Sequence, residues 1–364
     1  MSNNILEVRG LRVSRGGVLV LDIQELAIQA GEFLSIIGPN GTGKTTLLLS
    51  LAGLVKRESG ELRFHGRVVE NGAGLLAYRR RLAMVFQDPL LFDSTVYDNV
   101  AAGMKIRRIG RARIRPVVED NLALFGIAHL ASRSARKISG GEAQRTSLAR
   151  AFATDPEMIF LDEPFASLDP PTKESIIEDL GNAMRVKRTT AIMATHDRID
   201  SLRLSKRIAV MDGGKIIQVG PPEEVMNHPV NETVAVFVGI ETILEGKVAG
   251  SSGGMLEVIV NGRKIFATGP FTPGEQVLCL IRPEHVIVFP GYYAPGSSAR
   301  NVFPGRVMKV QPIGLLFRIQ IDCGFMLTAH VTPQAMDDLH VASGMQVVGV
   351  FKATAVHVMR SPTR

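Results

Sequence analysis

One eight-residue stretch constrains the fold of this chain more than any other. Residues 38–45 read Gly-Pro-Asn-Gly-Thr-Gly-Lys-Thr, which matches the pattern G-x-x-x-x-G-K-[ST]. An apolar run, residues 33–37, precedes this stretch, and Leu47 begins a second apolar run after it. The order of strand, glycine turn and helix predicts backbone N–H groups that surround a phosphate at a helix N-terminus. A glycine-rich turn beside a surface lysine is the alternative.

Each residue type in this loop has a chemical use. The glycines let the backbone close round a phosphate, because they lack a Cβ atom. We expect Lys44 to reach the β- and γ-phosphate oxygens of a nucleoside triphosphate, and the Thr45 hydroxyl to bind Mg²⁺. The residues expected to contact the nucleotide here are Gly38, Pro39, Asn40, Gly41, Thr42, Gly43, Lys44, Thr45 and Thr46.

Polar side chains follow three later apolar runs, and open α/β sheets place ligand groups at such strand ends. One run is followed by Gln87, one by Asp162 and Glu163, and one by His196. We expect Asp162 to join Thr45 as a Mg²⁺ ligand, because hard cations prefer oxygen. Gln87 is expected to supply its carbonyl oxygen to Mg²⁺ or to hold a water molecule in the reaction. Glu163 is then expected to orient or deprotonate the attacking water, and His196 to contact the γ-phosphate. Taken singly, each of these residues also fits a structural role at a strand end.

A second anion-ready helix start lies at residues 138–145, which read Ile-Ser-Gly-Gly-Glu-Ala-Gln-Arg. Ser139 can cap a helix, and two glycines allow another group to approach the backbone closely. Residues 97–130, just upstream, show apolar side chains at helical spacing, which predicts a helical insert beside the sheet. The residues expected to contact nucleotide at this second place are Ser139, Gly140, Gly141 and Glu142.

Length and charge bound the remaining possibilities. At 364 residues, with 45% hydrophobic and 21% charged residues, the chain is expected to form two or three globular units. No apolar run has the length of a membrane-spanning helix, and the first nine residues do not resemble a signal peptide. The net charge of +7 suits an anionic partner (nucleotide, phospholipid or nucleic acid), although a solvated helix face gives the same pattern. The densest cluster of cations contains Arg107, Arg108, Arg111, Arg113 and Arg115.

Short alternating apolar stretches take over after residue 239, which predicts a small all-β region. The region repeats itself: residues 245–248 correspond to 304–307, 274–277 to 344–347, and 281–286 to 351–356. We therefore expect two similar β-barrels packed together, one over residues 241–290 and one over residues 298–364. A Gly-, Pro- and Ser-rich hinge over residues 290–298 is expected to join them.

With these motifs in order, residues 5 to about 240 resemble the nucleotide-binding subunit of an ATP-binding-cassette (ABC) transporter. The likeness covers the phosphate loop, Gln87, the signature at 138–145, MIFLDEP at 158–164, ASLD at 166–169 and His196. Two positions depart from the usual pattern. Glu142 replaces the commoner glutamine, and Arg15 stands where an aromatic residue usually stacks on adenine, a role that a guanidinium plane can fill.

The resemblance implies an α/β P-loop NTPase domain over residues 1–240, with a helical subdomain at about 92–150, followed by an all-β, OB-like domain of two repeats. ATP and Mg²⁺ are the implied cofactors. The implied assembly is a head-to-tail homodimer in which ATP on Lys44 of one protomer meets Ser139, Gly140 and Gly141 of the other. Two membrane permease subunits, and indirectly a substrate-binding protein, are the implied partners. The implied location is peripheral, on the cytoplasmic face of the cell membrane.

Residues 298–301 and 351–358 resemble the two ends of the small molybdate-binding (TOBE/MOP) barrel that is fused to some molybdate and tungstate transporter ATPases. A tetrahedral oxyanion needs converging donors, and the implied ligands are Ser298, Arg300, Asn301, Lys352 and Thr354. The first repeat carries Arg282-Pro283-Glu284 at the corresponding place, and Glu284 would repel an anion.

The resemblance therefore implies an ATPase that energises import of molybdate or tungstate, with an oxyanion sensor in the C-terminal region. One alternative is import of another solute (sugar, polyamine, iron or sulfate), with a C-terminal barrel that is purely structural. A soluble ABC ATPase associated with nucleic acid is another. The single cassette and the lack of a sustained heptad pattern disfavour the latter, so no nucleic-acid partner is expected.

Overall fold

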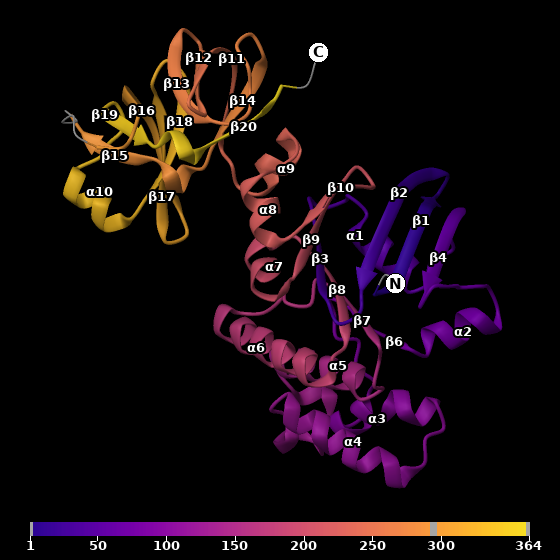
Figure 1. The fold of residues 1–364 in the computed structure, drawn as a ribbon. Helices are drawn as coiled ribbons and strands as arrows, with labels where there is room; N and C mark the ends of the chain where they lie inside the picture. The colour runs from indigo at the N-terminus through magenta and orange to yellow at the C-terminus, as the bar shows by residue number, and fades with distance from the viewer. Residues whose placement is uncertain (1–2, 292–296, 362–364) are drawn as a thin grey trace. The chain divides into compact units, whose positions relative to one another are not determined.

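The computed structural model describes residues 3–291 and 297–361 of the chain. Two compact units are present, Met1–Val225 and Met226–Arg364 (Figure 1). The first unit is an α/β structure, and the second is built mainly from antiparallel strands. The predicted fold class, a P-loop NTPase domain followed by an all-β region, is confirmed.

A six-stranded sheet lies at the centre of the first unit, in the order β10-β9-β3-β8-β7-β6. Neighbouring strands run parallel, except that β10 joins β9 in an antiparallel pair. Consequently, the carboxyl ends of β3, β6, β7 and β8 lie at one edge of the sheet. The bounds are β3 (Phe33–Ile37), β6 (Leu82–Val85), β7 (Met158–Asp162), β8 (Thr190–Thr195), β9 (Arg207–Asp212) and β10 (Lys215–Gly220).

Strand β7 shows why these strands read as continuous apolar runs. Successive side chains of a strand point to opposite faces of the sheet. Met158 and Phe160 therefore enter the core that the sheet shares with β1 and β2, while Ile159 and Leu161 enter the core beneath the helices. All five residues of β7 are buried, because helices or strands cover both faces.

A four-stranded antiparallel sheet, in the order β2-β1-β4-β5, completes the first unit's β structure. Strands β1 and β2 form an antiparallel pair at one end of this sheet, with Val8 opposite Leu26. Gly16 and Gly17 connect the two strands with φ angles of 58° and 80°, since a two-residue turn of this kind requires positive φ. The bounds are β1 (Asn4–Arg15), β2 (Val18–Gln29), β4 (Ser59–Phe64) and β5 (Arg67–Val68).

The predicted helical insert is present, and α3, α4 and α5 pack on one another (Figure 1). Their shared core includes Val100, Leu122 and Phe152, all of them almost fully buried. Among the described residues, no helix is long and apolar enough to cross a membrane. The helices of this part of the chain are α1 (Lys44–Leu51), α2 (Ala73–Arg79), α3 (Val96–Ile106), α4 (Arg111–Leu124), α5 (Gly140–Phe152), α6 (Pro170–Lys187), α7 (Arg198–Leu204) and α8 (Pro222–Asn227).

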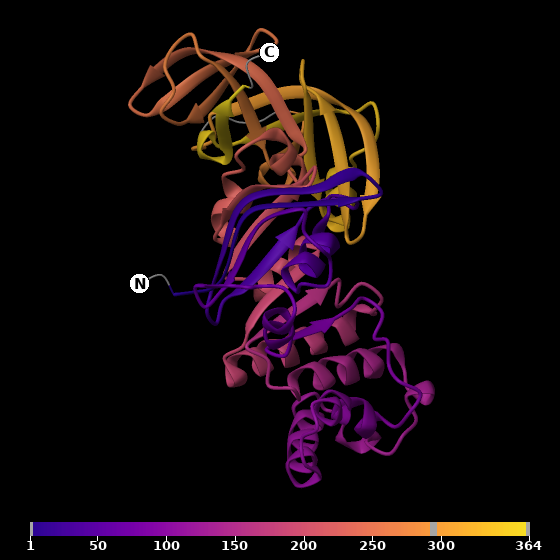
Figure 2. The same ribbon diagram turned by 90° about the vertical axis from the view of Figure 1, so that its right-hand side faces the viewer.

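The second unit contains two five-stranded sheets, seen in orange and yellow in Figure 2. Their orders are β13-β12-β11-β14-β20 and β15-β19-β16-β17-β18. The first-sheet strands are β11 (Thr242–Ser252), β12 (Met255–Val260), β13 (Arg263–Thr268), β14 (Gln276–Ile281) and β20 (Val356–Arg360). The second-sheet strands are β15 (Ile287–Pro290), β16 (Asn301–Ile313), β17 (Leu316–Asp322), β18 (Met326–Val331) and β19 (Gln346–Phe351). Two helices accompany them, α9 (Glu232–Phe237) and α10 (Pro333–Leu339).

The two repeats exchange their last strands. Strand β15, from the first repeat, pairs with β19 of the second, and β20 pairs with β14 of the first. Side chains from both repeats, including Val258, Ile281, Ile319 and Phe351, share one core. The sequence predicted two self-contained barrels. The structure instead has two sheets that each contain strands from both repeats. Exchange gives β14 and β19 a second hydrogen-bonded neighbour, so neither remains an unpaired edge.

One arginine holds the first residues of the second unit against its strands. Arg282 donates hydrogen bonds to the carbonyl oxygens of Met226 and Val238, at the ends of α8 and α9, where helix carbonyls lack intrahelical partners. The division between the compact units accordingly falls after Val225, upstream of the boundary expected at residue 240. Most of the hinge expected over residues 290–298 lies outside the described residues.

Candidate functional site

The phosphate loop between β3 and α1 depends on its glycines. A Cβ atom at Gly38 would lie 2.2 Å from the carbonyl oxygen of Met211. One at Gly43, which has a φ of 99°, would lie 2.8 Å from the Leu21 side chain. The contact at Gly38 is with a backbone atom that cannot move aside, and the φ of Gly43 is one that other residues rarely adopt, so both positions favour glycine.

Lys44 folds back over the loop that precedes it. Its Nζ donates to the carbonyl oxygens of Gly38 at 2.8 Å and Pro39 at 3.0 Å, and the residue is only 7% exposed. Burial lowers the pKa of Lys44, and the charges of Glu163 and Asp162 partly oppose that effect. Because an ammonium group has three N–H donors and two are used here, one remains for a phosphate oxygen.

The side chains of Thr45 and Asp162 are in contact, although 117 positions separate them in the chain. The Thr45 hydroxyl donates to Oδ1 of Asp162 at 2.9 Å. Burial, with a smaller contribution from the charge of Glu163, raises the pKa of Asp162, whereas Thr45 and Lys44 act to lower it. A buried carboxylate and a hydroxyl oxygen at this distance form a donor set that suits a hard divalent cation.

Glu163 and His196 form the opposite side of the site. Oε1 of Glu163 lies 2.9 Å from Nδ1 of His196, which directly follows β8. Glu163 has a φ of 46°, a left-handed conformation that is uncommon for residues other than glycine, and its backbone N–H donates to Ala194 at 2.9 Å. The strained turn therefore fixes Glu163 against the end of the neighbouring strand.

These groups surround a cavity of about 440 Å³. The predicted site residues that line this cavity are Asn40, Gly41, Gly43, Lys44, Thr45, Thr46, Gln87, Glu163 and His196. Gly38, Pro39 and Thr42 instead shape the loop, and Asp162 is reached through Thr45. The cavity thus brings together strand ends that lie far apart in the sequence.

The adenine side of the site differs from the prediction. Arg15, at the end of β1, is exposed and does not line the cavity, whereas Val20 of β2 does. Val20 was not singled out in the sequence, where it is one of several alternating apolar residues. Its neighbours Val18 and Leu19 are 66% and 50% exposed, so an apolar surface lies on this strand near the cavity.

The signature segment lies at the start of α5 and does not line the cavity. Glu142 N–H donates to the Ser139 hydroxyl at 3.3 Å, and Ser139 N–H donates to the Glu142 carboxylate at 2.7 Å. This reciprocal pair is a capping box, and the hydrogen bond from the Ser139 backbone holds the pKa of Glu142 below its ordinary value. Ser139 and Gly140 are exposed, so the helix start is open to another molecule.

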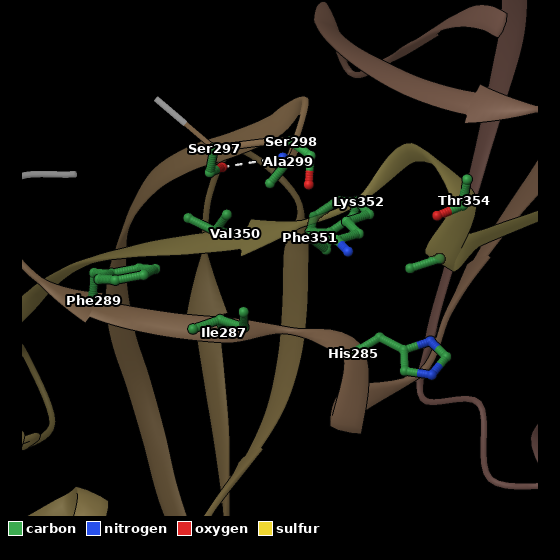
Figure 3. Close-up of a pocket in the computed structure, with 11 residues that line it drawn as sticks. His285, Ile287, Phe289, Ser297, Ser298, Ala299, Val350, Phe351, Lys352 and Thr354 are labelled. Carbon is green, nitrogen blue, oxygen red and sulfur yellow. Dashed lines mark hydrogen bonds between the residues drawn. The ribbon is translucent and has the colours of Figure 1, made fainter. Parts of the chain in front are cut away.

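A second cavity, of about 450 Å³, lies in the C-terminal unit (Figure 3). Figure 3 shows Ser298, Lys352 and Thr354 at its edge, with Ile287 and Phe289 on β15. Three of the five expected oxyanion ligands are therefore gathered beside a largely apolar wall.

The other two expected ligands lie elsewhere. Arg300 is exposed and does not line the cavity. Asn301 is fully buried, and both its hydrogen bonds, each 2.8 Å long, go to the backbone of Phe266 on β13. In the first repeat, the Arg282 guanidinium donates hydrogen bonds to the carbonyl oxygens of Met226 and Val238, and it lies 3.3 Å from the Glu284 carboxylate. The two repeats are thus not chemically equivalent.

A third hollow, a groove of about 560 Å³, lies between α2, β6 and the helical insert. Leu76, Phe92 and Ile106 line it, and their exposed fractions are 53%, 55% and 76%. Exposed apolar side chains gathered in one groove are typical of a protein-binding surface. Sequence reasoning missed this groove, because its residues come from four separate segments.

Comparison with known proteins agrees with the geometry. The sequence profile of the family described as ABC transporter matches residues 21–166, and that of the TOBE domain matches residues 297–358. The fold, the loop and the paired carboxylates define the first unit as an ATP-binding domain of the P-loop class.

Relatives extend this likeness over most of the chain. A molybdate/tungstate import ATP-binding protein from Pyrococcus abyssi is 37% identical over 336 residues, which is 91% of this chain and 93% of that protein. A spermidine/putrescine import ATP-binding protein from Spiroplasma citri is 35% identical over 326 residues, 89% of each chain. CbiO1 from Clostridium perfringens, part of the ABC transporter complex cbiONQ, has a TM-score of 0.59 and 30% identity, covering 65% of this chain and 95% of that one. The chain belongs to the family of ABC transporter ATP-binding proteins.

Proposed function

We propose that this chain is the ATP-hydrolysing subunit of an importer for molybdate or tungstate. The observation that carries the ATPase proposal is the meeting of Lys44, Thr45, Glu163 and His196 round one cavity. The proposal for the solute rests on the Pyrococcus abyssi relative and on the cavity beside Lys352. Import of a polyamine is the second candidate, because the Spiroplasma citri relative is almost as similar.

Nucleotide binding follows from the loop. The N–H groups at the start of α1 and the ammonium group of Lys44 would face the phosphates; the helix start carries a partial positive charge and the ammonium group a full one. Thr45, Asp162 and Gln87 would hold Mg²⁺ through oxygen atoms. When bound, Mg²⁺ supplies charge neutralisation on the β- and γ-phosphate oxygens.

Hydrolysis requires that a water molecule be held in line with the bond to the γ-phosphate. The Glu163 carboxylate lines the cavity and is fixed by its backbone bond to Ala194, so it can orient that water and accept its proton. His196 contacts Glu163 and is 54% exposed, which leaves its other ring nitrogen for the γ-phosphate. The residues thus supply position and charge, which phosphoryl transfer mainly needs.

We propose that the second half of the site comes from another copy of this chain. The exposed start of α5, with Ser139, Gly140 and Gly141, presents the backbone N–H groups of its two glycines but does not line the cavity of its own chain. In a head-to-tail homodimer each exposed helix start would cover the other copy's nucleotide. Each protomer then lacks a complete site when alone.

The groove lined by Leu76, Phe92 and Ile106 is the proposed contact for a membrane permease subunit, two of which would serve one dimer. It adjoins Gln87, because Phe86 also lines it, so nucleotide-dependent movement of this segment would reach the permease. In this proposal the protein works at the cytoplasmic face of the membrane, and a substrate-binding protein works on the other side.

We further propose that the cavity beside Ser298, Lys352 and Thr354 senses the imported oxyanion. One cation and two hydroxyl groups can donate to a tetrahedral anion. Asn301 is assigned a structural role that ties β16 to β13, and Arg300 is not assigned to the cavity.

Two experiments test the proposal. ATPase of the chain reconstituted with its permease should require ATP and Mg²⁺ and should disappear in Lys44→Ala. Calorimetric titration of the full chain with molybdate, tungstate and sulfate should show binding that Lys352→Ala removes and Lys309→Ala, at an exposed control position, retains. Suppose that the assembled transporter binds a spermidine-loaded substrate-binding protein and that the chain binds none of the oxyanions. That result would favour import of a polyamine instead.

A further inference from the structure

The loop between α3 and α4, with the adjoining helix ends, forms a surface that the catalytic site does not use. We call residues 105–115 the basic loop. It contains six cations and no acidic residue: Lys105, Arg107, Arg108, Arg111, Arg113 and Arg115. Lys105 pairs with Asp98, and Arg115 pairs with Glu119. Within the described part of the chain, Arg108, Arg111 and Arg113 have no acidic partner, and all three are exposed.

Two of the three isoleucines among these cations are exposed. Ile106 is 76% exposed and Ile109 is 37% exposed. A solvated helix face carries charge without large apolar side chains, so this combination is unusual for a surface that meets only water. Cations interleaved with exposed apolar residues are typical of segments that lie at a membrane interface.

The basic loop has a fixed backbone. Arg108 N–H donates to the Lys105 carbonyl at 2.9 Å, and Ile109 N–H donates to Met104 at 3.0 Å. The Arg107 guanidinium donates to the Thr154 carbonyl at 3.0 Å, which ties the loop to the end of α5. A surface that is ordered in advance loses little conformational freedom when it binds a partner.

Positive charge is concentrated here at some energetic cost to the free protein. Burial and the nearby charge of Arg80 lower the pKa of Arg107. Arg111 and Arg113 lie in the first turn of α4, the positive end of the helix, where acidic residues are favourable. An anionic surface would relieve both repulsions.

We propose that the basic loop binds the anionic phospholipid surface of the membrane beside the permease. This inference rests on the proposed function, because Ile106 and Arg107 also line the groove assigned to the permease. The groove and the basic loop are therefore continuous, and a subunit docked through the groove presents the basic loop next to the bilayer. The arginines contact head-group phosphates, while Ile106 and Ile109 enter the apolar layer beneath them. A nucleic acid offers phosphates but no such layer.

Flotation of the purified full chain with vesicles tests the proposal. The chain should bind vesicles that contain phosphatidylglycerol, should not bind vesicles of phosphatidylcholine alone, and should dissociate as salt is added. The triple variant Arg108→Gln, Arg111→Gln, Arg113→Gln should lose roughly 100-fold in partitioning, since each cation near an anionic membrane contributes about fivefold. Ile106→Ser should weaken binding without changing its dependence on salt.

A matched control separates the surface from net charge. Arg67→Gln, Lys247→Gln, Lys309→Gln removes the same charge from exposed positions outside the basic loop and should bind like the wild type. Equal loss in both triple variants, equal binding to both kinds of vesicle, or no binding to either would overturn the proposal. So would binding of short duplex DNA that depends on the three arginines when vesicles do not bind. ATPase and permease assembly in detergent should survive the arginine substitutions, so loss of the proposed function would be seen separately.

Discussion

Gln144 of α5 donates a hydrogen bond from Nε2 to the carbonyl oxygen of Pro164, 2.8 Å away. Pro164 directly follows Glu163, so the bond joins the helix that Ser139 caps to the turn that carries the carboxylate proposed to position the water. Gln144 is only 3% exposed, so its side-chain N–H group is shielded from solvent water. A partner that covers the start of α5 can therefore act on Glu163 through one buried contact.

This contact predicts a defect in hydrolysis without a defect in binding. Gln144→Met keeps the volume but removes the donor, and it should lower kcat several-fold because the Glu163 turn loses one support. Gln144→Glu should be worse, since a carboxylate would face the Pro164 carbonyl. ATP affinity, measured by fluorescent-nucleotide titration, should stay unchanged in both. Gln334→Met, at an exposed control position, should behave like the wild type; a similar loss of kcat there would show that the effect is not specific.

Glu163→Gln should abolish turnover while ATP still binds. The amide keeps the size of the side chain but neither accepts a proton nor attracts the water equally well, so kcat should fall roughly 100-fold or more. Glu174→Gln, at an exposed position on α6, is the matched control. Steady-state ATPase together with nucleotide titration measures both quantities. Rapid hydrolysis by Glu163→Gln would contradict the assignment.

Asp162→Asn should make the free chain more stable and inactive. Because burial raises the pKa of Asp162, keeping it ionised at neutral pH disfavours the folded state. Asparagine retains an acceptor for Thr45 and removes that charge, so the melting temperature without nucleotide should rise at pH 7. The gain should shrink as the pH falls through the raised pKa of folded Asp162, and it should be smallest below the ordinary value of 3.8, where the carboxyl group is neutral in both states. Hydrolysis should drop about 100-fold or more, because the charge opposite Mg²⁺ is lost.

The sign of the difference in melting temperature between Asp162→Asn and the wild type shows whether the Asp162 charge destabilises the folded chain. Thermal unfolding of both proteins is followed by circular dichroism at about pH 7 and about pH 5. A variant that melts below the wild type at neutral pH would show that the Asp162 charge is well compensated in the folded chain.

His357 predicts a pH dependence in the C-terminal unit. Burial, reinforced by His228 with its Nδ1 3.4 Å from that of His357, lowers the pKa of His357 below its ordinary value of 6.5. The unfolded chain then binds the proton more readily, so stability should fall as the pH drops below about 6.5. His357→Gln should flatten this dependence, and His340→Asn, at an exposed position, should not. Calorimetric midpoints between about pH 5 and pH 7.5 test this, and identical slopes in all three proteins would contradict it.

The catalytic cavity could be predicted from the sequence because each of its groups follows a strand. Parallel strands bring their carboxyl ends to one edge, so Thr45, Asp162 and His196 had to lie near one another once the strands were assigned. The capping role of Ser139 was equally readable, since it depends only on Glu142 three positions later.

Contacts between distant segments could not be read in this way. The hydrogen bond from Gln144 to Pro164, the left-handed φ of Glu163 and the use of Arg282 by two helix ends all depend on tertiary packing. Exchange of β15 and β20 between the repeats also escaped prediction, because pairing with either sheet satisfies the same alternating pattern. Asn301 looked like an anion ligand by residue type, but its burial against Phe266 is a property of the fold.

The central claim is that hydrolysis needs two copies of this chain, each completing the other's site. Light scattering of Glu163→Gln with ATP and Mg²⁺ tests it most directly. The account predicts that ATP doubles the molecular mass of this variant, and that Ser139→Glu, which places a carboxylate against the partner's phosphates, prevents the doubling. A variant that stays monomeric when saturated with ATP, alongside a wild type whose specific ATPase is independent of protein concentration, would contradict it.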